Sequence, residues 1–276
     1  MEESGIRLNK YLSEAGICSR READRLLEAG RITVDGHRAV LGERVSPGQQ
    51  VCLDGTLVGE KERPVVLLVN KPAGIVCTTA KFKGEKNIVD LVHYPIRLYP
   101  VGRLDKESEG LILMTNQGEL MNRILRPGNA HEKEYLVEVN RPVSAEFLEA
   151  MRRGVPILGT VTAPCKVEKT GPKSFRMILT QGLNRQIRRM CEYFDYRVTG
   201  LKRLRVMNIT LDGIAPGGYR EATEEELAAL LGLLVKSDGR PYKERNAGNR
   251  SMKEAGKSRK EPERRGEGSR STVRNK

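Results

Sequence analysis

The segment Pro100–Leu111, PVGRLDKESEGL, holds the densest group of side chains that could do chemistry. It places Arg103, Asp105 and Lys106 close together, between a proline and an apolar stretch. A carboxylate in an exposed loop could act as a nucleophile or as a base, because active sites are often built on loops. An aspartate in a polar loop more often forms a turn or caps a helix. The residues alone leave both interpretations open.

A group of arginines follows in QGLNRQIRRMCEYF, residues 181–194. A helix would place Arg185, Arg188 and Arg189 on one side, at offsets of three and four residues. One of them could pair with Asp105 and would then favour its ionised form. The alternative is a solvated basic helix face.

Few aromatic side chains are available for stacking on a nucleic-acid base. Aromatic residues make up 4% of the chain and Trp is absent, so each tyrosine becomes informative. Tyr135, in HEKEYLVEV (residues 131–139), is one candidate. Its alternative role is that of a strand aromatic facing the core.

Composition narrows the class of partner. The 276 residues include 49 Lys and Arg against 36 Asp and Glu, a net charge of +13, and the pI is about 9.6. Such a balance favours nucleic acid or an anionic membrane surface. No stretch approaches the roughly 20 apolar residues that span a bilayer, and the start, MEESGIRLNK, lacks the pattern of a secretory signal. We therefore expect a cytoplasmic protein with a nucleic-acid partner.

Metal chemistry has little support in the sequence. Five scattered cysteines and three scattered histidines indicate neither a disulfide framework nor a zinc site. A metal-dependent RNA nuclease would need a cluster of carboxylates or histidines to hold its ion, and no convincing cluster is visible.

Residues 1–62 read as a small domain with its linker. Helical spacing predicts a helix over residues 6–15, a capping box at Ser19–Glu22 predicts a second that runs to Gly30, and Asp35-Gly36 predicts a tight hairpin turn. Strand patterns flank that turn, and another follows at residues 51–53. The cations that would lie on or beside the helix pair are Lys10, Arg20, Arg21 and Arg25. Charge alone fits phosphate contacts and a solvated face equally well.

A second domain is predicted over residues 63–235. The apolar run Val65–Val69 is typical of a buried strand, and a capping box at Thr223–Glu226 opens a closing helix. Between them strand patterns alternate with helical ones, which argues for an α+β domain with a largely antiparallel sheet. The strand patterns cover residues 110–115, 135–139, 174–180 and 203–211, and the helical ones cover residues 145–153 and 184–194. Residues 236–276 are basic with almost nothing to bury, which predicts a disordered tail that adds non-specific RNA affinity.

Several motifs resemble one known family. Residues 100–111 resemble the signature of the RsuA and RluB/RluE/RluF family of rRNA pseudouridine synthases, whose nucleophilic aspartate falls at Asp105. LLVNKPAGIVCTT (residues 67–79), HEKEYLVEV and QGLNRQIRRMCEYF resemble further motifs of that family, in the same order. GICSRREADRLLEAGRITVDG resembles its αL-type, ribosomal-protein-like RNA-binding domain, so the likeness covers nearly everything except the tail. The motifs look most like the RluF group, which acts on large-subunit rRNA.

The resemblance implies a fold and an activity. The fold would be α+β: an N-terminal αL-type domain, then a pseudouridine synthase domain with a mainly antiparallel mixed sheet flanked by helices. The enzyme would isomerise uridine to pseudouridine without a cofactor or metal, as a monomer. Its substrate would be ribosomal RNA or a large-subunit assembly particle, with tRNA left open as a further substrate. A non-catalytic RNA-binding assembly protein is the alternative.

The resemblance also implies roles for single residues. Tyr135 would stack on the target uracil, Arg188 would pair with Asp105, and Arg103 would enter the RNA as the uridine leaves its stack. Whether Asp105 attacks the sugar or removes a sugar proton stays open, as does the choice among the three arginines. The other residues expected to contact RNA are Leu104, Lys106, Arg185, Gln186, Ile187 and Arg189. Lys71, before a proline that could simply end a strand, receives no catalytic role.

Overall fold

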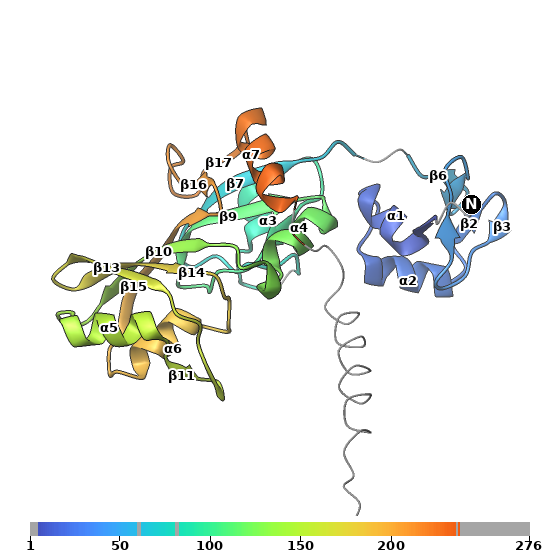
Figure 1. Cartoon of the computed structure of the whole chain (residues 1–276). Helices are drawn as coiled ribbons and strands as arrows, with labels where there is room; N and C mark the ends of the chain where they lie inside the picture. Colours follow the sequence, from blue (N-terminus) through green and yellow to red (C-terminus); the bar gives the residue numbers. More distant parts are fainter. Residues whose placement is uncertain (1–4, 60–61, 81–82, 236, 238–276) are drawn as a thin grey trace, which may run out of the picture. The chain divides into compact units, whose positions relative to one another are not determined.

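The computed structural model describes residues 5–59, 62–80, 83–235 and 237 (Figure 1). The expected disordered tail, residues 236–276, lies outside the described residues apart from Ser237. No helix within the described part of the chain is long and apolar enough to cross a membrane.

Residues 5–59 form a small domain with its own core. Two helices, α1 (Leu8–Glu14) and α2 (Arg20–Glu28), are followed by short strands. The strands are β1 (Ile6–Arg7), β2 (Ile32–Val34), β3 (His37–Arg38), β4 (Arg44–Val45), β5 (Val51–Leu53) and β6 (Thr56–Leu57). One sheet has the order β3-β2-β5-β6, and β1 pairs with β4. Apolar side chains from both helices and from β2, β4 and β5 form the core.

Local signals in this domain mostly hold. The Ser19 hydroxyl accepts a hydrogen bond from the Glu22 amide, as predicted, whereas the Glu22 carboxylate pairs with Arg25. Asp35 and Gly36 both have positive φ, at 48° and 84°, which is the backbone that a tight hairpin turn requires.

A nine-stranded sheet dominates the other residues that the structure describes (Figure 1). Its order is β13-β14-β10-β15-β9-β7-β17, with β16 added to β15 and β8 added to β9. Only β15 and β9 pair in parallel among these described strands, so the predicted mixed, mainly antiparallel sheet is confirmed. The strands are β7 (Val66–Lys71), β8 (Tyr99–Val101), β9 (Glu109–Thr115), β10 (Lys133–Val139), β13 (Lys166–Gly171), β14 (Ser174–Leu179), β15 (Val198–Val206), β16 (Ile209–Thr210) and β17 (Tyr219–Glu221), beside the separate hairpin β11 (Pro156–Ile157) and β12 (Thr160–Val161).

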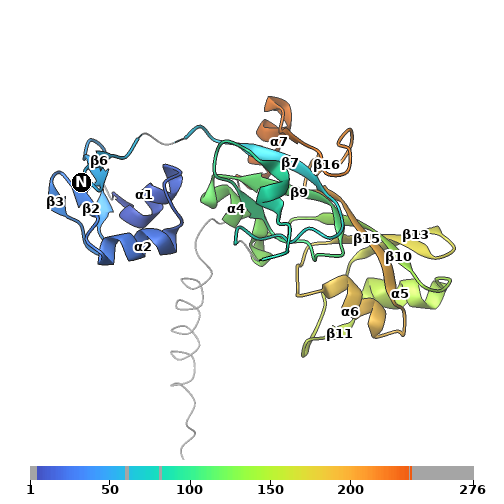
Figure 2. The ribbon, with the colours of Figure 1, turned by 180° about the vertical axis from the view of Figure 1, so that it is seen from behind.

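Helices cover both faces of the β7–β9 half of the sheet (Figure 2). Side chains alternate along a strand, so Val66 and Leu68 face one side and Leu67 and Val69 face the other. The first face packs against α4 (Gly118–Leu125) and α7 (Glu224–Leu234), and the second packs against α3 (Ile88–Val92). Burial on both faces explains why β7 reads as a continuous apolar run.

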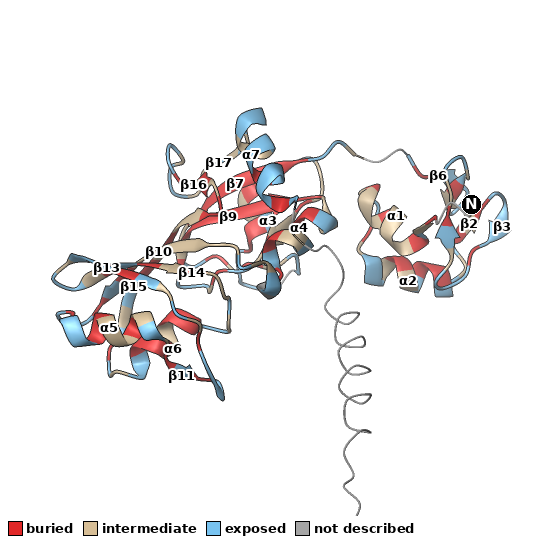
Figure 3. Cartoon of the chain, in the orientation of Figure 1, coloured by how far each residue is buried: buried red, intermediate tan, exposed pale blue. Residues whose placement is uncertain are grey.

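The β10–β14 half of the sheet has a separate core. There α5 (Ala145–Arg153) and α6 (Gln186–Glu192) pack against strands β10, β13, β14 and β15. Figure 3 shows buried residues on α5 and α6, whereas the strands of this half alternate between buried and more exposed residues. One 3-10 turn, η1 (Pro127–Asn129), follows α4.

Three predicted elements differ from the structure. The helix expected over residues 6–15 covers only Leu8–Glu14, because Ile6 and Arg7 pair with β4 as strand β1. The strand expected over residues 203–211 belongs to two strands, because β15 starts at Val198 and the chain turns at Met207, with φ of 54°, into β16. The helix expected over residues 184–194 is shorter, since Arg185 has φ of 48° and precedes the first helical residue.

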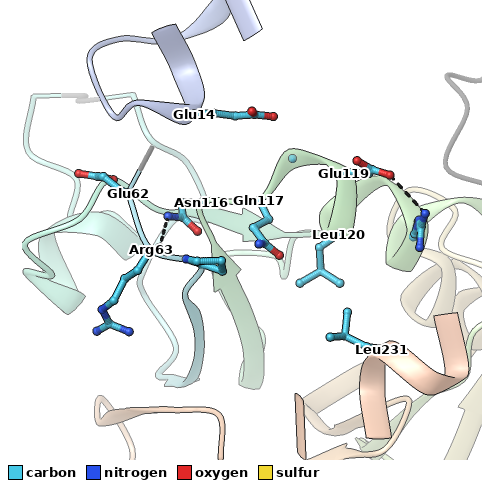
Figure 4. A pocket seen from close by; sticks show the side chains of 11 residues that line it. Glu14, Glu62, Arg63, Asn116, Gln117, Glu119, Leu120 and Leu231 are labelled. Atoms are coloured by element: carbon cyan, nitrogen blue, oxygen red, sulfur yellow. Dashed lines mark hydrogen bonds and ion pairs between the residues drawn. The ribbon is translucent and has the colours of Figure 1, made fainter. Parts of the chain in front are cut away.

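Asparagine and threonine side chains fix the start of β7. Asn116 accepts from the Val65 amide at 3.0 Å and donates to the Arg63 carbonyl at 2.8 Å, and Thr115 donates to the Val65 carbonyl at 2.6 Å. Figure 4 shows Asn116 and Arg63 at a hollow whose wall also includes Leu120 and Leu231. This hollow contains none of the residues that the sequence singles out for chemistry.

Candidate active site

The loop between β8 and β9 presents Asp105. Its carboxylate is 31% exposed, and the amide of Ser108 donates to the Asp105 carbonyl at 3.0 Å, closing a turn. Gly110, the second residue of β9, follows the loop; its φ is 102° and a Cβ there would lie 2.3 Å from the carbonyl oxygen of Arg203. A glycine is therefore required for β9 to approach β15 at this point.

Lys71, at the end of β7, supports this loop through hydrogen bonds to its backbone. Its side chain is fully buried, and its ammonium donates to the carbonyls of Ser108 at 2.6 Å, Pro72 at 2.8 Å and Lys106 at 3.3 Å. Burial lowers the pKa of the Lys71 ammonium. Sequence reasoning gave this lysine no part in catalysis, and the structure places it as a support for the Asp105 loop.

Two arginines lie against the Asp105 carboxylate. Arg188 Nε and Arg185 Nη1 are each 3.5 Å from Asp105 Oδ2. Arg188 is the more enclosed, with 11% of its side chain exposed against 41% for Arg185, and it also donates to the Ser108 hydroxyl at 3.1 Å. Arg185 is shared with the Glu107 carboxylate at 3.5 Å. Both arginines can therefore balance the charge of Asp105, and Arg188 does so in a more fixed position.

Arg189 points elsewhere. Its guanidinium donates to the backbone carbonyl and to the side-chain oxygen of Asn184, at 3.2 and 3.4 Å. Of the three arginines on the predicted helix face, only Arg185 and Arg188 reach Asp105.

Tyr135 lies in the middle of the sheet, on β10. It is half-buried and packs against the cores of both halves of the domain. In the register it stands opposite Met177 of β14 and Arg203 of β15. It lines the same pocket as Asp105, so the two candidates that the sequence separates by 30 residues share one site.

The pocket itself has a volume of about 330 Å³, at the small end of the range for small-molecule sites. Its walls come from the Asp105 loop, the inner strands and the segment before α6. Its lining includes Arg103, Asp105, Lys133, Tyr135, Arg188 and Arg203.

The remaining predicted RNA contacts divide by burial. Arg103 is exposed at the pocket, and Lys106 is exposed and paired with Glu85 at 2.9 Å. Leu104, Gln186 and Ile187 line the pocket but have buried side chains. Their contact with RNA stays a prediction.

The cations of the N-terminal domain lie on its helices. Arg20, Arg21 and Arg25 are exposed on α2, and Arg25 pairs with Glu22 at 3.0 Å. Lys10 on α1 pairs with Glu14 at 3.5 Å. Their role in RNA binding also stays a prediction.

Sequence reasoning missed Ser108, Lys133 and Arg203. Lys133 could have been found, because it precedes Tyr135 by two residues and alternation puts both on one strand face. Arg203 carries no local signal, since it reaches the pocket only through the pairing of β15 with β10 and β9. Groups of three or more His, Cys, Asp or Glu that could hold a metal ion are absent from the described residues.

Comparison with known proteins gives a consistent likeness. The family model described as RNA pseudouridylate synthase matches residues 65–193, and the S4 domain model matches residues 6–51. The chain is 53% identical over 240 residues to the "Dual-specificity RNA pseudouridine synthase RluF" of Escherichia coli (strain K12), covering 86% of this chain and 82% of that protein. It is 34% identical to the "Ribosomal large subunit pseudouridine synthase B" of Bacillus subtilis (strain 168), covering 82% and 96%.

Solved structures agree with this likeness. A crystal structure described as pseudouridylate synthase superposes with a TM-score of 0.61 at 27% identity, covering 82% of this chain and all of that chain.

Proposed function

Since the chain belongs to the RsuA/RluB/RluE/RluF family of pseudouridine synthases, we propose that it isomerises one uridine of large-subunit ribosomal RNA, with Asp105 as the catalytic carboxylate. The chain is an RNA pseudouridine synthase of the RluF type with an S4 domain. The large-subunit substrate and the role of Asp105 are the proposed parts.

One observation carries the role of Asp105: its carboxylate lies in a pocket with Tyr135 and is held by two arginines. The reaction breaks the bond between ribose C1′ and uracil N1 and then joins C1′ to C5. Breaking the first bond leaves C1′ electron-poor, so a carboxylate there can attack the carbon, stabilise its charge or remove a sugar proton. Arg188 fixes the carboxylate and balances its charge before the substrate arrives.

The pocket accommodates a base that has left its stack. Unstacking a nucleotide costs a few kcal/mol, which contacts in the pocket must offset. Tyr135 offers an aromatic face, and Arg103, which is exposed at the pocket, would take the place of the departed base. The cations of α1 and α2 would contact phosphates elsewhere on the RNA.

Large-subunit RNA is proposed because the Bacillus relative bears that substrate in its name and the chain is rich in cations. We place the protein in the cytoplasm as a monomer that meets free rRNA or a large-subunit assembly particle. Mapping pseudouridine in rRNA and tRNA from cells with and without the gene tests this. A site in large-subunit rRNA that disappears supports the proposal, whereas loss confined to tRNA or small-subunit rRNA contradicts it.

The role of Asp105 is tested with Asp105→Asn. We expect pseudouridine formation to be abolished while RNA affinity changes only a few-fold, because the cationic surface is kept. Tritium release from RNA that contains 5-tritiated uridine measures the reaction. Glu107→Gln is the matched control, since Glu107 also contacts Arg185 but is 63% exposed. Near-normal turnover by Asp105→Asn would remove it from catalysis, and RNA binding without any turnover by the native protein would favour an RNA-binding assembly protein.

A further inference from the structure

Two cations line the inner wall of the pocket in addition to the arginines that hold Asp105. Lys133 lies on β10 and Arg203 lies on β15. Arg203 is only 3% exposed, and Lys133 is half-buried. Neither has a role in the proposed catalysis by Asp105.

Strand geometry places these two cations beside Tyr135. Lys133 and Tyr135 are two residues apart on β10, so their side chains leave the same face of the sheet. Tyr135 and Arg203 stand directly opposite each other in the β10–β15 register, and directly opposed side chains also share a face. The three side chains therefore form one patch, in which two cations adjoin an aromatic ring.

The hydrogen-bond donors of the two cations are only partly paired with acceptors among the described residues. Arg203 donates through Nε to the Leu111 carbonyl at 2.6 Å, while its Nη2 is buried and has no hydrogen-bond partner among the described residues. Lys133 donates to the His131 carbonyl at 2.9 Å. Within the described part of the chain, neither cation forms an ion pair with a carboxylate, unlike Arg185 and Arg188.

Such an arrangement is costly in the free protein. Burial, and after it the neighbouring charge of Arg203, lowers the pKa of Lys133 to about 8. Enclosed like charges without a counter-charge are unfavourable, because water no longer screens them. The patch is therefore suited to a group that brings negative charge into the pocket.

We propose that Lys133 and Arg203 bind the carbonyl oxygens of the uracil while that base is detached from the ribose. This proposal rests on the proposed function. When the bond between C1′ and N1 breaks, its electron pair stays on the uracil, whose negative charge spreads over N1 and the two carbonyl oxygens. Cations held in place before the reaction stabilise that charge and keep the detached base in the pocket. The later bond between C1′ and C5 uses an electron pair of the ring, C5 loses its proton and N1 gains one, so no oxidant or reductant is needed.

Depth in the pocket favours the base over a phosphate as the bound group. Arg203 is almost fully enclosed, whereas the side chains of Arg185 and Lys106 are 41% and 48% exposed. A flipped base goes deepest, and the RNA backbone stays at the surface. A base stacked on Tyr135 would also bring its edge against the two cations that flank that ring.

Lys133→Met tests the proposal because it keeps the length of the side chain and removes the charge. We expect its single-turnover rate at saturating enzyme to fall about 10²-fold, the loss typical of one donor to a developing oxyanion. RNA affinity should stay within about threefold, and Lys133→Arg should recover part of the rate. Lys202→Met is the matched control, since Lys202 lies one residue from Arg203 on β15 and outside the pocket lining. That control should react at the native rate.

The salt dependence of RNA binding shows whether Lys133 contacts the base or a phosphate. If Lys133 contacts a phosphate, Lys133→Met will bind more weakly, the slope of log K against log[salt] will fall by about 1, and the saturated rate will be native. That result overturns the proposal. A saturated rate equal to that of Lys202→Met overturns it too. If Asp105→Asn is active, the proposed function fails, whereas an inactive Asp105→Asn beside a fully active Lys133→Met contradicts this inference alone.

Atomic substitution in the RNA tests the same contact without depending on the folding of a variant. Sulfur accepts hydrogen bonds more weakly than oxygen, so RNA with 2-thiouridine or 4-thiouridine at the target position should react more slowly with the native enzyme. The loss should be smaller in Lys133→Met if its ammonium is the donor, as in a double-mutant cycle. Because sulfur also changes the stability of the detached uracil anion, the deciding quantity is the ratio of thio-substrate rate to normal-substrate rate. Equal ratios in the native enzyme and in Lys133→Met overturn the proposal.

Discussion

Replacing Lys71 by methionine should destabilise the loop that carries Asp105, because Lys71 supports the backbone of that loop. The ammonium is the shared donor to three backbone carbonyls, those of Pro72, Lys106 and Ser108. The Lys106 carbonyl also accepts from the Gly74 amide at 2.7 Å, so all three carbonyls lose a donor but only those of Pro72 and Ser108 lose the one donor that the structure describes for them. Each buried, unpaired carbonyl costs about 1–3 kcal/mol, which gives about 2–6 kcal/mol in total. Removing a buried charge recovers part of this cost, so we expect a net loss of about 2–4 kcal/mol.

Activity should fall as well, because the loop that carries Asp105 loses its support. A displacement of about 1 Å at a reacting group can cost about 10²-fold in rate. Urea unfolding followed by circular dichroism measures stability, and single-turnover pseudouridine formation measures the chemical step. Lys169→Met is the control, since Lys169 donates at 3.3 Å to the Val143 carbonyl, away from the pocket. An unfolding midpoint and a rate for Lys71→Met that both match the native protein would refute this reasoning.

Four further predictions follow from particular residues. Tyr135→Ala should lose base stacking, which contributes roughly 1–3 kcal/mol per base. Tyr135→Phe should bind RNA normally yet turn over slowly if the hydroxyl moves a proton, and single-turnover rates separate the two roles. Gly110→Ala should destabilise the fold by at least about 3 kcal/mol, because its Cβ would lie 2.3 Å from a backbone oxygen, and thermal unfolding measures this. The pKa of Lys133 is lowered from 10.5 to about 8, so the unfolded chain binds more protons than the native protein between these pH values. The stability of the native protein should therefore rise relative to that of Lys133→Met as the pH increases from about 8 to 10.5. Urea unfolding at each pH measures this difference. Truncation after Val235 should weaken RNA binding chiefly at low salt and leave the saturated single-turnover rate unchanged.

Elements with strong local signals were predictable from the sequence. The helix expected over residues 145–153 has those bounds, because Ser144 accepts from the Phe147 amide and Gly154 ends the run. The capping box at Thr223 and Glu226 is also present in both directions. In each case the residues that decide the boundary lie within one helical turn of it, so the tertiary fold has little to add.

Contacts between distant strands were not predictable in the same way. Strand β17 pairs with β7 through Tyr219 and Val69, which are separated by 150 residues without a sequence pattern to connect them. The pairing of β10 with β15 shifts in register between Glu134 and Tyr135, so counting residues alone would not have put Arg203 opposite Tyr135. Family resemblance identified Asp105 and Arg188 as partners, whereas the inner cations required the sheet.

The strand connections of the large sheet determine when a newly synthesised chain can first become active. The core of the N-terminal domain uses residues 8–58 only, so that domain has all its core residues early in translation. The pocket cannot be completed until Arg203 has been synthesised, 98 residues after Asp105, because Arg203 lies on β15, the strand between β9 and β10. The edge of β7 is covered later still, because its partner β17 is synthesised after β15. A ribosome-bound chain would thus hold a complete RNA-binding domain well before it holds a catalytic site.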